Sequence, residues 1–251
     1  MSENRGTQGR YAELGERLRQ NKDSRADRWA QYFLMLLMYL AISALAISNE
    51  AVSAKLGLPI HKPVVVLDAG HGGIDPGKVG VNQALEKEIN LAIVLKLKAY
   101  LEANDVTVYL TRETDDGLYT SSDSNKKRAD MNRRCQLIEE IQPDLVVSIH
   151  QNSYSQEGVC GPQIFYYKTS EQGKKLAELL QERLNSMPEC MNRRVAKANG
   201  DYYLLLHVSC PIVIAETGFL SNWQEAGMLV TEAYQDRLAW ELCLGIVEYL
   251  R

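Results

Sequence analysis

The sequence predicts an α/β protein: a single three-layer domain with a mostly parallel, twisted sheet flanked by helices, preceded by one N-terminal transmembrane helix. Three observations predict this class. Apolar, β-branched runs alternate with amphipathic segments of helical length over residues 63–251, which is typical of βαβ units. The runs at 64–67 and 145–149 are continuously apolar, as expected for strands buried on both faces. Residues 29–48 carry no charge at all.

Composition excludes several classes of protein. The chain has 251 residues, of which 45% are hydrophobic and 24% charged, with 17 glycines and 7 prolines. It is therefore neither disordered nor collagen-like, and it is long enough for one full-sized domain with additions. Lys and Arg number 28 against 32 Asp and Glu, a formal net charge of −4. The basic excess of a nucleic-acid-binding protein is absent, so no nucleic-acid partner is expected.

Residues 29–48, WAQYFLMLLMYLAISALAIS, are the predicted transmembrane signal anchor. A helix of this length spans roughly 30 Å, the thickness of a bilayer core. Basic residues just before it predict a cytoplasmic tail at 1–28, a single membrane pass and an extracytoplasmic remainder of the chain. One alternative is a buried core helix. Another is a signal peptide cleaved after the small-x-small sequence at 44–46, which leaves a secreted protein. The long region before the apolar segment favours the anchor.

A linker at 49–62 leads into the domain at 63–251. Its first strand, 64–67, ends in a glycine-rich turn, GHGGIDPG, at 70–77. Helical periodicity follows at 88–103, and a second β-branched run at 106–110 predicts the next strand.

The second half of the domain continues the alternation. A polar loop at 120–125 precedes a predicted helix at 126–141, which ends before Pro143. The remaining expected strands are 145–149, 163–167 and 212–215, and the remaining expected helices are 170–187 and 231–250.

Three polar residues stand at predicted strand ends: His71, His150 and Glu216. Since parallel strands end at one edge of a sheet, these side chains are expected to converge there. Two histidines and a carboxylate can bind zinc with one position left open for water, and a second carboxylate is then needed as a general base. Glu86 and Glu88, at the start of the next helix, are further candidates. Topology alone does not choose the ligand among the three glutamates.

Other chemistries fit the sequence less well. The glycine turn matches neither the dinucleotide nor the P-loop pattern. The five cysteines have no metal-binding spacing, and none follows a strand end, as a nucleophile would. They are interpreted as small buried apolar residues, although an exported domain could form two disulfides. They are Cys135, Cys160, Cys190, Cys210 and Cys243.

Five segments, in this order and spacing, carry a family resemblance: VVVLDAGHGGIDPGKVG, LEKEINLAIVLKLKAYL, VYLTRETD, PDLVVSIHQNS and IVIAETGFLSN. The chain resembles the zinc-dependent N-acetylmuramoyl-L-alanine amidases of bacterial cell-wall metabolism, the Amidase_3 family, over roughly residues 63–251. The anchor and the lack of added wall-binding repeats in this sequence resemble the short spore-cortex, germination-specific (CwlD-like) type, which implies a role in sporulation.

The resemblance implies the roles of particular residues. His71, Glu86 and His150 match the family's zinc ligands, and Glu216 matches its catalytic carboxylate. Family positions also match Arg134, and Asn152 follows the second histidine motif; both are predicted substrate-binding residues. The family usually has Ala after the S-I-H histidine, where this chain has Gln151.

The implied reaction is hydrolysis of the amide that joins N-acetylmuramic acid to L-alanine in peptidoglycan. Zn²⁺ is the implied cofactor, peptidoglycan the substrate, and an activating protein partner is a further expectation. Three alternatives remain: a zinc carboxypeptidase on the same fold, a non-catalytic wall-binding homologue, and a scaffold in a membrane complex. A carboxypeptidase needs a basic pocket, for which the candidates are Arg112, Arg128, Arg133 and Arg134.

Overall fold

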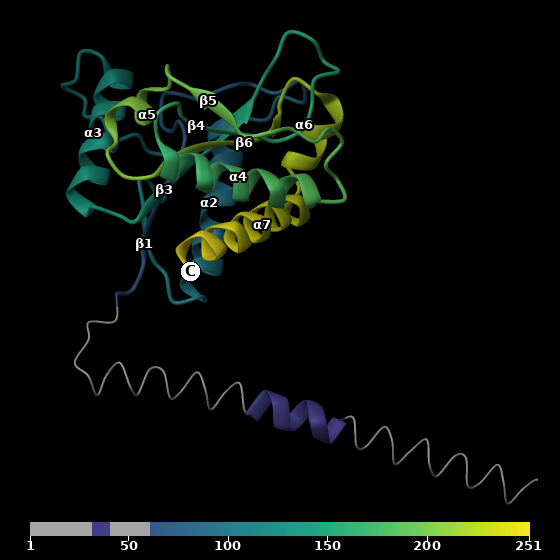
Figure 1. Cartoon of the computed structure of the whole chain (residues 1–251). Coiled ribbons are helices and arrows are strands. Elements are labelled where there is room, and N and C mark those ends of the chain that lie inside the picture. Colours follow the sequence, from purple (N-terminus) through teal and green to yellow (C-terminus); the bar gives the residue numbers. More distant parts are fainter. Residues whose placement is uncertain (1–31, 41–60) are drawn as a thin grey trace, which may run out of the picture. The chain divides into compact units, whose positions relative to one another are not determined.

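The computed structural model describes residues 32–40 and 61–251 (Figure 1). The chain divides into two compact units, Met1–His61 and Lys62–Arg251. In the first unit, residues 32–40 are helical. Among the described residues, no helix is both long and apolar enough to cross a membrane. The predicted tail at 1–28, and most of the anchor at 29–48 and of the linker at 49–62, lie outside the described residues and stay predictions.

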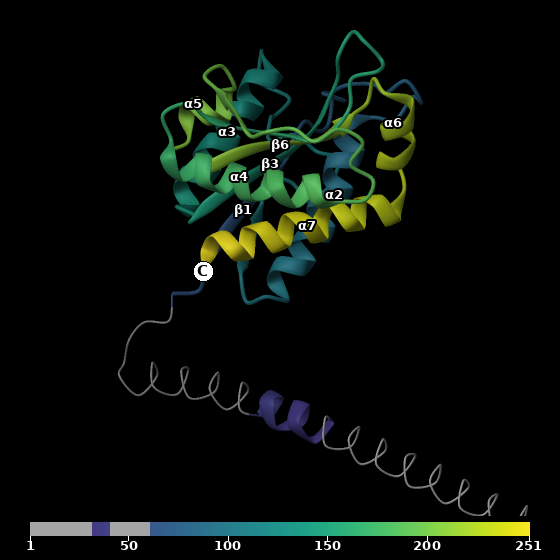
Figure 2. The same ribbon diagram turned by 45° about the vertical axis from the view of Figure 1, so that its right-hand side comes forward.

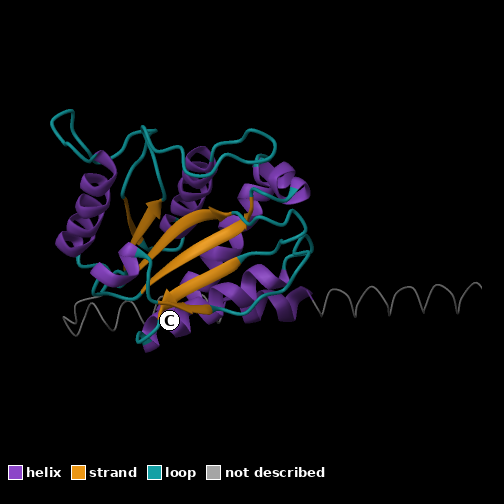
Figure 3. Cartoon of the chain, turned by 90° about the horizontal axis from the view of Figure 1, so that it is seen from above, coloured by secondary structure: helices purple, strands orange, loops and turns teal. Residues whose placement is uncertain are grey.

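The second unit is built on one six-stranded mixed sheet, whose strands are drawn in orange in Figure 3. The strand order is β2-β1-β3-β6-β4-β5. Four neighbouring strands are parallel, as predicted: β2, β1, β3 and β6. Strand β4 runs antiparallel to β6, and β5 is parallel to β4. The strands are β1 (Val64–Ala69), β2 (Thr107–Leu110), β3 (Leu145–Asn152), β4 (Gln163–Tyr167), β5 (Lys197–Asn199) and β6 (Ile212–Phe219).

Helices cover both faces of this sheet, so the predicted three layers are confirmed. One face packs against α2 (Glu86–Glu102), α4 (Glu171–Ser186) and α7 (Glu232–Leu250). Helices α4 and α7 lie side by side there (Figures 1 and 2). The other face packs against α3 (Lys126–Ile141) and α5 (Tyr203–His207). A further helix, α6 (Trp223–Leu229), follows β6.

Strand β1 explains why the sequence run at its position is continuously apolar. Val65 and Leu67 belong to the core cluster on the α2 face, whereas Val66 belongs to the cluster on the α3 face. All three side chains are fully buried. A strand buried on both sides therefore fixes the centre of the domain and brings its carboxyl end to a defined place.

Differences from the predicted elements are local. Helix α3 has the predicted bounds, but α2 begins at Glu86 rather than residue 88, and β3 and β6 extend beyond 149 and 215 to Asn152 and Phe219. Strand β4 runs antiparallel to β6, so the sheet is mixed, whereas the sequence predicted a mostly parallel sheet without assigning a direction to each strand. Only residues 153–162, with no helix among them, separate β3 from β4, and such a connection does not supply the helical crossover that a parallel return requires.

The five cysteines are unpaired in the structure. Cys135 and Cys243 are buried, and the other three are partly buried. This agrees with their interpretation as structural apolar residues.

Candidate metal centre and active site

The carboxyl ends of β1, β3 and β6 meet at one edge of the sheet, as the sequence predicted. Ala69 of β1 pairs with Ile149 of β3, and His150 of β3 lies directly opposite Glu216 of β6. The glycine-rich turn after β1 carries His71 to the same edge. Helix α2, which follows this turn, begins at Glu86.

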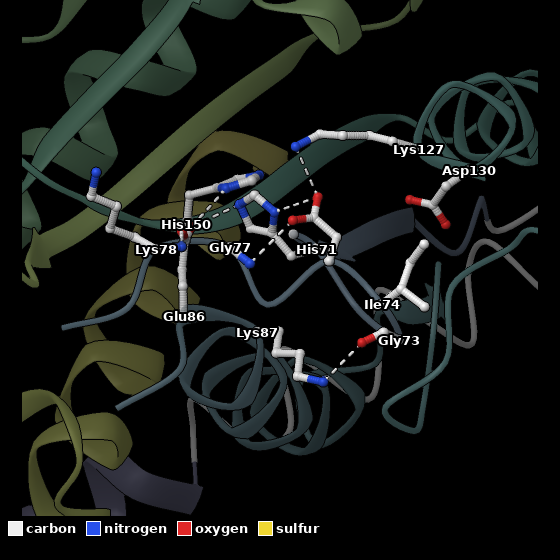
Figure 4. A network of polar contacts seen from close by, with 12 residues as sticks. His71, Gly73, Ile74, Gly77, Lys78, Glu86, Lys87, Lys127, Asp130 and His150 are labelled. Atoms are coloured by element: carbon white, nitrogen blue, oxygen red, sulfur yellow. Dashed lines mark hydrogen bonds and ion pairs between the residues drawn. The ribbon is translucent and has the colours of Figure 1, made fainter. Parts of the chain in front are cut away.

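His71, Glu86 and His150 bring one donor atom each to within 4.8 Å of one another. The Glu86 Oε1 atom lies 3.2 Å from His71 Nε2 and 3.0 Å from His150 Nδ1 (Figure 4). The two imidazole rings meet edge to face, with centroids 4.9 Å apart. Glu88 is exposed on α2 while Glu86 is buried, so the structure selects Glu86 over Glu88 as the carboxylate in this cluster.

Two glycines make room for the cluster. A Cβ atom at Gly70 would overlap the His150 ring. A Cβ atom at Gly77 would lie 2.7 Å from both Glu86 Oε2 and His71 Cδ2, and the φ of Gly77, +68°, already favours glycine. The glycine-rich turn is therefore required by the packing around the donors.

The backbone conformation of His71 and its contact with Asp75 define the orientation of the imidazole ring. Its backbone has a φ of 65°, a left-handed conformation that is uncommon for a residue with a side chain. The Asp75 carboxylate lies 3.0 Å from its Nδ1 atom, which leaves Nε2 for the cluster. Lys127 in turn lies 3.0 Å from Asp75. Asp75 was not among the site residues predicted from the sequence, although it stands in the same glycine-rich turn.

The charges of the cluster fit a cation. Burial raises the pKa of Glu86, but hydrogen bonds and charge from His150 and His71 outweigh burial and hold it well below its usual range. Burial lowers the pKa of His150, but the Glu86 carboxylate outweighs this effect and raises it. Both shifts mean that positive charge between these groups is favourable, and a divalent ion can supply that charge in place of protons. Two imidazoles and one carboxylate are donors that zinc accepts.

Glu216 stands beside the donors but outside their group. Its side chain is 7% exposed, and within the described part of the chain its Oε2 atom has no hydrogen-bond partner. Burial, opposed chiefly by the charge of His150, raises the pKa of Glu216 to about 7. A carboxylate with this pKa can accept and return a proton near neutral pH.

A cavity of about 590 Å³ joins these groups. Its walls include the three donors, Glu216, Asn152 and Arg134. The Asn152 side chain is partly exposed there, and its Oδ1 atom accepts a hydrogen bond from the Ser153 backbone at 2.8 Å. Substrate binding by Asn152 stays a prediction.

Arg134 has internal partners for its guanidinium, which is 1% exposed. Nη1 donates to Asp68 Oδ1 at 2.6 Å, Nε donates to Asp130 at 2.7 Å, and Nη2 donates to the His71 carbonyl at 2.6 Å. Substrate binding by Arg134 also stays a prediction. Its observed contacts support the turn that carries His71.

We expect Arg134→Met to lower the free energy of unfolding by about 3–5 kcal/mol, because it leaves a buried carboxylate without its cation. Burial alone would raise the pKa of Asp68, but Arg134 and nearby hydroxyl groups lower it to about 2. Denaturant unfolding of the variant measures the loss. Arg128→Met, an exposed site on the same helix, is the control and should change stability by less than about 0.5 kcal/mol. Equal stability of the two variants would contradict the structural role.

A cluster of three potential metal donors beside a buried carboxylate, at the carboxyl edge of an α/β sheet, is typical of hydrolases. Within that class, the chain belongs to the Amidase_3 family, described as N-acetylmuramoyl-L-alanine amidase, whose model matches residues 65–248. The family predicted from the sequence motifs is therefore confirmed.

Individual relatives match most of the chain. The germination-specific N-acetylmuramoyl-L-alanine amidase of Bacillus subtilis is 32% identical over 225 residues, which is 88% of this chain and 94% of the relative. A solved structure of the CwlD amidase from Clostridioides difficile, in complex with the GerS lipoprotein, is 39% identical. It has a TM-score of 0.72 and covers 75% of this chain and 98% of its own. The catalytic domain of CwlV from Bacillus (Paenibacillus) polymyxa is 30% identical, with a TM-score of 0.66 and coverage of 75% and 98%.

Proposed function

We propose that this chain is a zinc-dependent peptidoglycan amidase that hydrolyses the bond between N-acetylmuramic acid and L-alanine. The observation that carries the proposal is the convergence of His71, Glu86 and His150 beside the buried Glu216 carboxylate, whose Oε2 atom has no partner among the described residues, in a chain of the Amidase_3 family. The three donors would hold the ion. When bound, zinc supplies Lewis acidity, which polarises the scissile carbonyl and lowers the pKa of water.

The chain's own residues account for orientation and proton transfer. Asp75 fixes the ring of His71 through Nδ1. The second oxygen of Glu86 accepts the Lys78 backbone N–H at 2.7 Å, and its first oxygen accepts the Gln151 N–H at 3.0 Å. Glu216 takes a proton from the attacking water and returns it to the departing L-alanine nitrogen, so that the stem peptide leaves as a free amine.

Product analysis tests this function. The purified full chain is incubated with peptidoglycan, with zinc or with a chelator, and the products are identified by mass spectrometry. We expect zinc-dependent release of stem peptides with a new L-alanine amino terminus. Release of single carboxyl-terminal amino acids would instead indicate a carboxypeptidase. No cleavage by the zinc-loaded chain would indicate a site that requires a partner or a particular substrate, and no cleavage without bound zinc would indicate partner-dependent metal loading or a non-catalytic role.

The internal contacts of the candidate arginines argue against the carboxypeptidase alternative. Arg112 donates to the carbonyls of Ala69, Gly70 and Lys87. Arg133 forms an ion pair with Asp123 at 2.6 Å. With Arg134 also occupied internally, three of the four candidate arginines already have partners within the fold, which leaves Arg128 as the remaining candidate.

We further propose that the chain acts at the outer face of the cell membrane, anchored through residues 29–48, and that a protein partner assists it in spore formation or germination. The uncharged segment supports the anchor. The germination-specific relative supports the role in spore formation or germination. The solved complex of CwlD with a lipoprotein supports the protein partner. The mass of the chain recovered from membranes distinguishes an uncleaved anchor from a removed signal peptide.

A further inference from the structure

Tyr202 faces the same cavity as the metal donors, and neither the sequence motifs nor the proposed proton transfer assigns it a role. It immediately precedes α5 and lines the cavity together with Glu216. Its backbone N–H donates to Asn199 Oδ1 at 2.9 Å, and its ring packs edge-on against Phe165 with centroids 5.4 Å apart. The side chain is therefore held from both the backbone and the ring.

The Tyr202 hydroxyl donates a hydrogen bond to Glu216 Oε1 at 3.3 Å. The other oxygen of this carboxylate, Oε2, is the one without a partner among the described residues. The two oxygens of Glu216 are thus made unequal by one contact: Oε1 is occupied by a donor, and Oε2 keeps its lone pairs free.

The phenol remains a donor over the whole working range of pH. Burial, together with the charge of Glu216, raises the pKa of Tyr202 well above its ordinary value. A neutral phenol beside a carboxylate can only donate to it.

We propose that Tyr202 is a positioning residue for Glu216: its hydroxyl holds the carboxylate by Oε1 so that Oε2 exchanges the proton during amide hydrolysis. The inference rests on the proposed function of Glu216 and deepens it. Without the phenol, a carboxylate that rotates about its terminal bond would spend less time in the reactive orientation. The loss should therefore fall on the chemical step and not on substrate binding.

Tyr202→Phe tests the inference, because it removes the hydroxyl and keeps the ring that packs on Phe165. We expect kcat to fall roughly tenfold, with KM changed less than about twofold and with zinc content and thermal midpoint unchanged. The matched control is Tyr100→Phe, which removes another phenol–carboxylate bond, 2.8 Å long, to Asp236. That contact joins α2 to α7 outside the cavity, so kcat should not change.

A double-mutant cycle separates positioning from a general structural effect. If Tyr202 acts through Glu216, Tyr202→Phe should add no further loss in the Glu216→Gln background. The inference would be overturned if the kcat losses of the two substitutions multiplied in the double variant. A raised KM with unchanged kcat in Tyr202→Phe would also overturn it and would indicate a substrate contact. Failure of the proposed amidase function would show separately, as absence of cleavage by the unmodified chain. In that event, the ¹³C NMR chemical shift of the Glu216 carboxyl group still tests the hydrogen bond to Tyr202. An unchanged shift in Tyr202→Phe would show that the hydrogen bond is absent.

Discussion

Glu216→Gln is expected to lower kcat for amide hydrolysis at least about 10²-fold, the scale of general acid–base catalysis, while zinc content stays the same. The amide side chain has nearly the shape of the carboxylate but cannot take a proton from water. Glu216 does not belong to the donor group His71, Glu86 and His150, so the ion should remain. Steady-state rates on a soluble muropeptide and metal analysis of the same sample measure both quantities.

A second buried glutamate supplies the control for this variant. Burial also raises the pKa of Glu225, but its two oxygens accept the backbone N–H groups of Gly161 and Phe219, each at 2.8 Å. Glu225→Gln should affect stability and leave kcat within about twofold of the unmodified chain. Unchanged activity in Glu216→Gln would remove Glu216 from the mechanism. Activity lost together with zinc would make it a ligand instead of a base.

The parallel half of the fold could be predicted because its signals are local. The apolar run of β1 and the periodicity of α3 depend on burial of nearby residues, and each gave the correct element. The three-residue strand β5 and the five-residue helix α5 are too short to show a period. The direction of β4 depends on its pairing with β6, about 50 residues later in the chain, and no local pattern encodes such a contact.

The candidate site likewise has residues that the sequence predicted and a role that it did not predict. Topology alone predicted that His71, His150 and Glu216 would meet, since each follows an apolar run in the sequence. The choice of Glu86 over Glu88 came from the family resemblance, and the structure gives its physical reason: Glu86 lies one helical turn before Ile89, on the buried face of α2. The internal role of Arg134 could not be predicted, because its partner Asp68 lies 66 positions away and an arginine in a helix is usually exposed.

Glu86→Ala is expected to weaken zinc binding at least about 10²-fold, while Glu88→Ala leaves it unchanged, because loss of a ligand should exceed the 10–100-fold typical of outer partners. The two residues are matched in type and helix, but Glu86 is 4% exposed and contacts both histidines, whereas Glu88 is exposed. Zinc dissociation constants from competition with a chromogenic chelator measure the difference without using activity.

Glu86 also accepts hydrogen bonds from the Lys78 and Gln151 backbone, so its removal could disturb the turn as well as the ligand set. Glu86→Gln separates the two effects in part, since its amide oxygen can still accept one of the two backbone hydrogen bonds, whereas its amide nitrogen cannot accept the other and the charge is lost. If the carboxylate is a ligand, Glu86→Gln should lower the thermal midpoint of the metal-free chain less than Glu86→Ala does and still lose zinc affinity to the same extent. If only the turn matters, Gln should restore the affinity that Ala removes, and equal affinity of Glu86→Ala and Glu88→Ala would exclude Glu86 from the metal centre altogether.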